Sequence, residues 1–142
     1  MGTLAEAFGR DHHRWEQLLD ETAAQVGAAR WDAAAAGFAA FRRGIERHMG
    51  VEEQYLFPSV EDGGETPLTA TLRKGHRDLR VFFDELHDAL DAQDVEEYGR
   101  IARTMRALLA RHDETEEAQL YPAAEARLGA DAAVVAARLG NG

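Results

Sequence analysis

Cysteine is absent from the 142-residue sequence, and its absence excludes several classes of site. Without thiolates the chain can form no disulfide, no cysteine-ligated iron–sulfur cluster and no zinc finger, and it has no cysteine nucleophile. Any bound metal must therefore be held by histidine nitrogens and carboxylate oxygens.

Long apolar runs and positive charge are also scarce. No stretch approaches the roughly 18 apolar residues of a membrane span, and the first residues have neither the basic nor the apolar region of a secretory signal. Sixteen Lys and Arg stand against 26 Asp and Glu, for a formal charge of -10. A surface of this charge repels phosphate backbones and anionic lipids. We therefore expect a cytoplasmic protein with no nucleic-acid and no membrane partner.

Residues that disfavour helices are few as well. Proline occurs three times, β-branched residues are sparse, and Ala, Leu, Arg and Glu dominate, which favours helix over strand. Start and stop signals divide the chain into four helices at about 3–27, 31–61, 66–92 and 94–128.

The residues at the predicted helix starts support this division. Thr3 with Glu6, and Asp94 with Glu97, have the spacing of reciprocal capping boxes. Thr66 is expected to cap the third helix, ahead of a proline in its first turn. The sequence thus predicts an all-α fold: one domain over 1–142, with an up-down-up-down four-helix bundle over about 3–128 and a short tail helix within 129–142.

The second half of the sequence repeats the first with a shift of 64 positions and no gap. The shift places His12 on His76, His48 on His112, Glu52 on Glu116 and Pro58 on Pro122. Each repeat is one helix pair, and two such pairs make the predicted bundle with quasi-twofold symmetry.

Apolar residues recur every three or four positions along each predicted helix and mark the face turned to the core. Six titratable residues interrupt these core stripes: His12, His48, Glu52, His76, His112 and Glu116. A buried carboxylate without a partner costs several kcal/mol, so we expect cations to bind among the two glutamates and four imidazoles. Iron, manganese or zinc would suit these ligands, and a ferritin-like oxidase is a weaker fit because it needs Glu-x-x-His spacing.

Four short motifs resemble the hemerythrin-like, HHE cation-binding family over residues 3 to 128. They are AspHisHisArgTrp at 11 to 15, HisMetGlyValGluGlu at 48 to 53, GlyHisArgAspLeu at 75 to 79 and HisAspGluThrGluGlu at 112 to 117. The resemblance implies two iron ions bridged by an oxygen species. It also implies that Glu52 and Glu116 bridge them, with His12 and His48 on one iron and His76 and His112 on the other.

Leu72 is a departure from this family's oxygen carriers, which have a fifth histidine one turn before the position of His76. The four-histidine, two-glutamate set resembles instead relatives linked to nitric oxide, peroxide, oxygen sensing or repair of iron centres. Six further residues are expected around the site or its pocket: Trp15, Tyr55, Leu72, Leu79, Phe83 and Gln119. Tyr55 and Gln119 are expected to face inward and to break the symmetry of the site.

Two hypotheses for function follow. In the first, a di-iron protein binds or turns over a small diatomic or peroxide ligand, with an electron donor that the sequence does not identify. In the second, the chain is an iron-sensing, oxygen-sensing or interaction module whose folding depends on metal occupancy. Whether the protein is an enzyme is left open.

Overall fold

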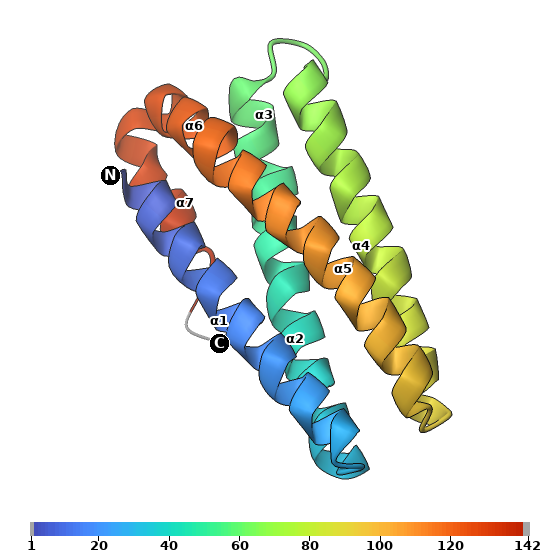
Figure 1. Cartoon of the computed structure of the whole chain (residues 1–142). Helices are drawn as coiled ribbons and strands as arrows, with labels where there is room; N and C mark the ends of the chain where they lie inside the picture. Colours follow the sequence, from blue (N-terminus) through green and yellow to red (C-terminus); the bar gives the residue numbers. More distant parts are fainter. Residues whose placement is uncertain (1, 141–142) are drawn as a thin grey trace.

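The computed structural model describes residues 2–140, and every regular element in that range is helical. Four long helices lie alongside one another: α1 (Thr3–Gly27), α2 (Trp31–Val51), α4 (Pro67–Asp91) and α5 (Val95–Thr115) (Figure 1). Helix α1 packs on α2 and α5, and α4 packs on α2 and α5. This arrangement confirms the predicted all-α bundle.

Two of the predicted helices contain a π-helical turn. Helix α2 continues through η1 (Glu52–Leu56) into α3 (Phe57–Val60), and α5 continues through η2 (Glu116–Leu120) into α6 (Tyr121–Leu128). The N–H of Phe57 donates to the carbonyl of Glu52, five residues earlier, and Tyr121 does the same to Glu116. Pro58 and Pro122 follow the two turns. Because proline has no N–H and its ring clashes with the carbonyl four residues earlier, a regular α-helix cannot pass this point undisturbed.

The helix starts agree with the predicted caps in two cases of three. The Thr66 hydroxyl accepts from the N–H of Thr69 in a reciprocal capping box, and Asp94 accepts from the N–H of Glu97. The glutamate of that second pair binds Arg100, so its box is only half formed.

The predicted cap at Thr3 is wrong. Helix α1 starts after Gly2 with no side-chain cap of its own. The reason is tertiary: α6 brings the Glu125 carboxylate to the start of α1, where it accepts from the N–H of Leu4 at 2.8 Å.

The tail contains the predicted short helix, α7 (Ala132–Ala137), which follows the 3₁₀ turn η3 (Gly129–Asp131) and packs on α1 (Figure 1).

The 64-residue repeat of the sequence is also seen in ion pairs between the two halves. Arg42 binds Asp84, and Arg106, its repeat equivalent, binds Asp20, the equivalent of Asp84. The sequence repeat is thus also a repeat of contacts between the halves.

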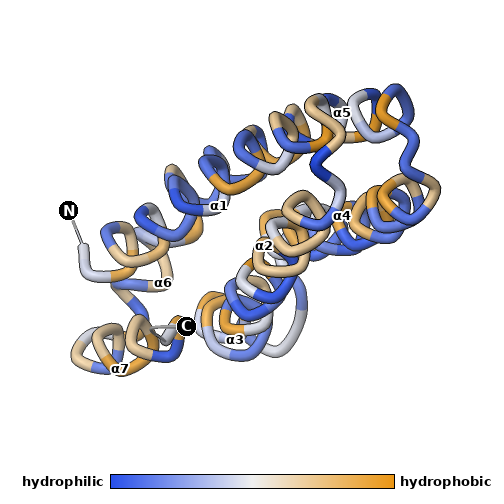
Figure 2. The backbone as a smooth tube through the Cα atoms, turned by 90° about the horizontal axis from the view of Figure 1, so that it is seen from below, coloured by the Kyte–Doolittle hydropathy of each residue, from blue (hydrophilic) through white to orange (hydrophobic). Residues whose placement is uncertain are grey.

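The core consists of two apolar clusters with a polar layer between them. One cluster includes Trp15, Phe41 and Leu79, and the other includes Phe8, Leu72 and Tyr121. Apolar and polar residues alternate along the helices (Figure 2), and most of the buried residues are apolar. Among residues 2–140, no helix is both long and apolar enough to cross a bilayer.

Gly44 lies where α2 meets the indole of Trp15. A Cβ atom placed on Gly44 would lie 1.9 Å from Cη2 of that ring, so the helices can approach only without a side chain here. Gly50, on the same helix, has nothing within 4 Å of its own Cβ position.

Gly44→Ala is therefore expected to destabilise the fold by about 1–3 kcal/mol, because overpacking outweighs the helix preference of alanine. Gly50→Ala, the matched control, is expected to stabilise the fold by up to about 1 kcal/mol. Thermal unfolding of both variants measures the difference. Equal behaviour would contradict the close approach at Gly44.

Candidate metal centre

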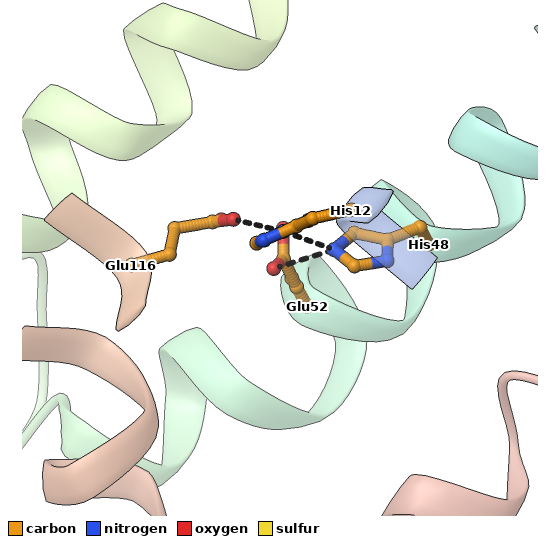
Figure 3. A group of neighbouring side chains, drawn as sticks. All are labelled: His12, His48, Glu52 and Glu116. Atoms are coloured by element: carbon orange, nitrogen blue, oxygen red, sulfur yellow. Dashed lines mark hydrogen bonds and ion pairs between the residues drawn. The ribbon is translucent and has the colours of Figure 1, made fainter. Parts of the chain in front are cut away.

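The polar layer contains all six residues predicted as ligands, and one or two of them come from each long helix or its continuation. They fall into two groups that share both glutamates: His12, His48, Glu52 and Glu116, and Glu52, His76, His112 and Glu116. Within each group, one donor atom per residue lies within 4.8 Å of all the others. Figure 3 shows the first group converging on a common point.

Each glutamate places one carboxylate oxygen near each group. Oε2 of Glu52 lies 3.1 Å from Nε2 of His48, and its Oε1 lies 3.1 Å from Nε2 of His76. Oε1 of Glu116 lies 3.3 Å from Nε2 of His12, and its Oε2 lies 3.1 Å from Nε2 of His112. Both glutamates begin a π turn, and they are the residues that interrupt the regular helix at the site.

Three of the four imidazoles are oriented by a carboxylate on their outer nitrogen. Nδ1 of His12 lies 2.8 Å from Glu117, that of His76 lies 2.7 Å from Glu53, and that of His48 lies 3.2 Å from Asp11. Such partners fix the ring and strengthen its other nitrogen as a metal ligand. The sequence analysis did not identify these three carboxylates, although Glu53 and Glu117 directly follow the two shared glutamates at equivalent positions.

The electrostatics of the layer favour positive charge. Burial lowers the pKa of the imidazoles, but the surrounding carboxylates outweigh it and raise the pKa of His12 to about 9, of His48 to about 10 and of His76 to about 11. Burial also works to raise the pKa of Glu53, yet hydrogen bonds with His76 and Arg80 lower it to about 2.

The donor set fits a pair of cations. Nε2 of His12 and Nε2 of His48 face each other at 3.2 Å, an arrangement that suits two ligands of one cation better than two N–H donors. Nε2 of His112 and Oε2 of Glu116 are buried 3.1 Å apart, and neither has a well-directed hydrogen bond within residues 2–140. A cation in each group would satisfy these atoms together, since imidazole nitrogen and carboxylate oxygen are both good ligands for transition metals.

Tyr121 is a site residue that the sequence analysis missed. Its hydroxyl lies 2.7 Å from Oε2 of Glu52, 2.9 Å from Oε1 of Glu116 and 3.0 Å from Nε2 of His12. Burial and the two glutamates raise its pKa well above the usual value. The phenol therefore stays protonated and can donate to one of the two shared glutamates.

Tyr55 and Gln119 do not face the site, so this part of the prediction is wrong. The ring of Tyr55 is half-buried beneath Arg138, and Gln119 is exposed. The inward positions were predicted for a regular α-helix, but each π turn adds a residue before the helix returns to the same face. The residue five positions after Glu116, Tyr121, thus takes the inward place.

Tyr121→Phe is expected to weaken metal binding about tenfold, the usual order for loss of a hydrogen-bond partner of a ligand. Titration against a competing chelator measures this change. Tyr55→Phe is the control and should bind metal like the parent chain. A Tyr121→Phe variant with unchanged affinity would show that the phenol only fills space.

A small cavity adjoins the polar layer on the side of the first apolar cluster. Its volume of about 10 Å³ is room for about one water-sized molecule. Trp15 and Leu79 line it, as the sequence predicts for the pocket wall. Phe83 packs deeper, edge-on to Phe41, and Leu72 belongs to the second apolar cluster, so neither lines this cavity.

Asp113 is a second missed residue, and it lines the same cavity. Its side chain is 6% exposed, and burial raises the pKa of its carboxyl to about 7. It follows a predicted ligand by one residue, a position that the helical spacing places off the core stripe. The narrow approach of α5 to α1 nevertheless encloses it.

Comparison with known proteins gives one match. The family model for the Hemerythrin HHE cation binding domain matches residues 3–124. No curated protein and no solved structure matches the chain.

Proposed function

Because the chain belongs to the hemerythrin HHE cation-binding family, we propose that it binds two iron ions in the polar layer and that this pair binds or reacts with a small oxidant. The oxidant classes proposed are dioxygen, peroxide and nitric oxide. One observation carries the proposal: two groups of four buried ligands share both of their glutamates.

In this proposal Glu52 and Glu116, which both groups share, would hold both metals. His12 and His48 complete one position, and His76 and His112 complete the other. Iron supplies redox chemistry and open coordination places for a small ligand. Two histidines and two shared carboxylates leave such places, and Leu72 adds no further ligand.

The surrounding residues determine what could reach the pair. Trp15, Leu79 and Met49 give the adjoining cavity an apolar wall that keeps bulk water away. Besides the proposed ligands, Tyr121 and Asp113 are the polar groups beside the metal-facing nitrogen of His12, at 3.0 and 3.4 Å. A ligand of two or three atoms matches the size of the cavity better than an organic substrate does.

Anaerobic reconstitution with ferrous iron tests the proposal. About two iron ions per chain are expected, followed by a change in the visible spectrum on exposure to dioxygen, peroxide or nitric oxide. Reversible spectra would indicate a carrier or sensor, and consumption of peroxide would indicate an enzyme. A chain that takes up no ferrous iron, or whose iron reacts with none of the three oxidants, would overturn the proposal.

Metal uptake is expected to release protons and to tighten as the pH rises. The raised pKa values mean that His12, His48 and His76 are protonated at pH 7 in the metal-free chain, whereas a metal needs the neutral ring. A raised folded-state pKa stabilises the metal-free fold below about pH 6.5, and this contribution is lost as the pH passes 9 to 11.

Calorimetric titration with zinc or ferrous iron at pH 6, 7 and 8, in buffers of different ionisation enthalpy, gives the number of protons released for each metal ion bound. An affinity that does not change with pH would contradict the protonation of these rings. The exposed His13, beside a predicted ligand, offers a control when replaced by Gln, because its removal should leave the proton count unchanged.

A further inference from the structure

The 64-residue repeat allows the surroundings of the two metal positions to be compared residue by residue. The ligands match, but the groups around them do not. The position of His12 and His48 has Asp11, Asp113 and Tyr121, where the other position has Gly75, Met49 and Phe57. Two carboxylates and a phenol in one half are therefore replaced by groups without charge in the other.

The first difference concerns the outer nitrogen of a histidine. Asp11 is 3.2 Å from Nδ1 of His48, whereas the equivalent residue beside His112 is Gly75, which has no side chain. A Cβ atom on Gly75 would lie 2.5 Å from Nδ1 of His112, so no carboxylate can be carried there. A surface pocket of about 220 Å³ reaches His112 on this side instead.

The second difference lies on the metal-facing side. Oδ1 of Asp113 lies 3.4 Å from Nε2 of His12, close to the oxygen that Glu116 directs at the same nitrogen. The equivalent residue in the other half is Met49, which is buried and carries no charge. A cation beside His12 would thus face one more carboxylate than a cation beside His76.

The third difference is an arginine beside one of the two outer glutamates. Glu53, which orients His76, is bound by the guanidinium of Arg80 at 2.9 and 3.2 Å. The first half has Glu16 at the position equivalent to Arg80, so Glu117, which orients His12, has no matching guanidinium. The carboxylate behind His76 therefore transfers less negative charge to its ring than the carboxylate behind His12 does.

From these differences we infer that the two metal positions are unequal, and that the position of His12 and His48 retains its metal while the position of His76 and His112 loses it first. This inference rests on the proposed two-metal site. Loss of an outer partner of a metal ligand usually changes affinity by 10–100-fold, so release from the two positions should differ by about that factor.

Extraction of the two-iron protein by an excess of chelator tests the inference. The parent chain is expected to release one iron in a fast phase and the other in a phase about 10–100-fold slower. Two ligand variants assign the phases. His112→Gln should remove the fast phase and keep the slow one, and His48→Gln should do the reverse.

The two outer glutamates form a matched pair at equivalent positions. Glu117→Gln should accelerate the slow phase, whereas Glu53→Gln should change only the fast one. Asp113→Asn, which keeps the shape of the side chain, should also accelerate the slow phase. Circular dichroism of each variant checks that the bundle is intact, and the nearly isosteric Asp113→Asn decides the matter should a histidine variant unfold.

The outcomes separate the inference from the proposed function. Two irons that leave the parent chain in one phase, an unchanged slow phase in Asp113→Asn, or a slow phase that disappears in His112→Gln would each overturn the inference while the two-iron site stands. A parent chain that binds no iron would instead overturn the proposed function.

Discussion

Glu52→Gln is expected to abolish the two-metal centre, with the affinity for the pair lowered by more than about 100-fold, because loss of a ligand costs more than loss of an outer partner. Glu52 is fully buried, and its two oxygens lie near His48 and His76, one in each group. An amide has almost the same shape but offers only one acceptor and no charge. One substitution should therefore weaken both positions together.

Metal content of protein purified without a chelating column, and ferrous titration of the apoprotein, measure this effect. Glu116→Gln should behave in the same way, since it is the second shared glutamate. The matched control is Glu114→Gln, because this exposed glutamate lies on α5 two residues before the shared one. If Glu52→Gln kept two tightly bound metal ions, the shared-carboxylate site would be refuted.

Removal of the metals is expected to destabilise the protein strongly without unfolding it. A ligand present at about 1,000 times its dissociation constant stabilises the folded state by about 4 kcal/mol, and this stabilisation disappears on chelation. The metal-free layer also buries Glu52, Glu116 and Asp113, whose ion-pair partners within residues 2–140 are imidazoles. Both effects act in the same direction.

The helices themselves should survive, since the two apolar clusters on either side of the layer do not depend on metal. A chelated sample should thus keep most of its far-ultraviolet circular dichroism at 25 °C and unfold at a lower temperature than the loaded protein. The reference variant is His13→Gln, which changes an exposed residue. Its loaded and chelated samples should differ in melting temperature by the same amount as those of the parent chain. Loss of most helix on chelation would instead favour the metal-dependent folding module.

The ligands could be predicted from the sequence because their spacing is local and duplicated. His48 and Glu52 lie one helical turn apart, and the 64-residue shift reproduces that pair at His112 and Glu116. Such spacing predicts which side chains share a face, because helix geometry places residues four positions apart on the same side. The structure accordingly brings together the same residues that the core stripes suggest.

The π turns could not be predicted in the same way, and the errors follow from them. A stripe drawn with α-helical spacing gives Tyr55 and Gln119, while the added residue in each turn places Tyr121 at the site. Proline at two equivalent positions was the available signal, since each proline removes a backbone donor just beyond the glutamates.

Asp11 and Asp113 could not be identified because their roles depend on a neighbouring helix. Asp11 meets His48 across the pair formed by α1 and α2, 37 residues away along the chain. Asp113 is enclosed where α5 approaches α1. No pattern within a single helix encodes such contacts.

The hydrogen bond from Leu4 to Glu125 has a consequence for how the chain is made. It joins the first turn of the protein to a residue 121 positions later, so the leading helix emerges from the ribosome long before its cap exists. The ligands are likewise spread from residue 12 to residue 116. A metal pair held by all six residues would therefore assemble only after residue 116 has left the ribosome, and a nascent chain stalled before residue 76 would present two histidines and one glutamate with no partner half.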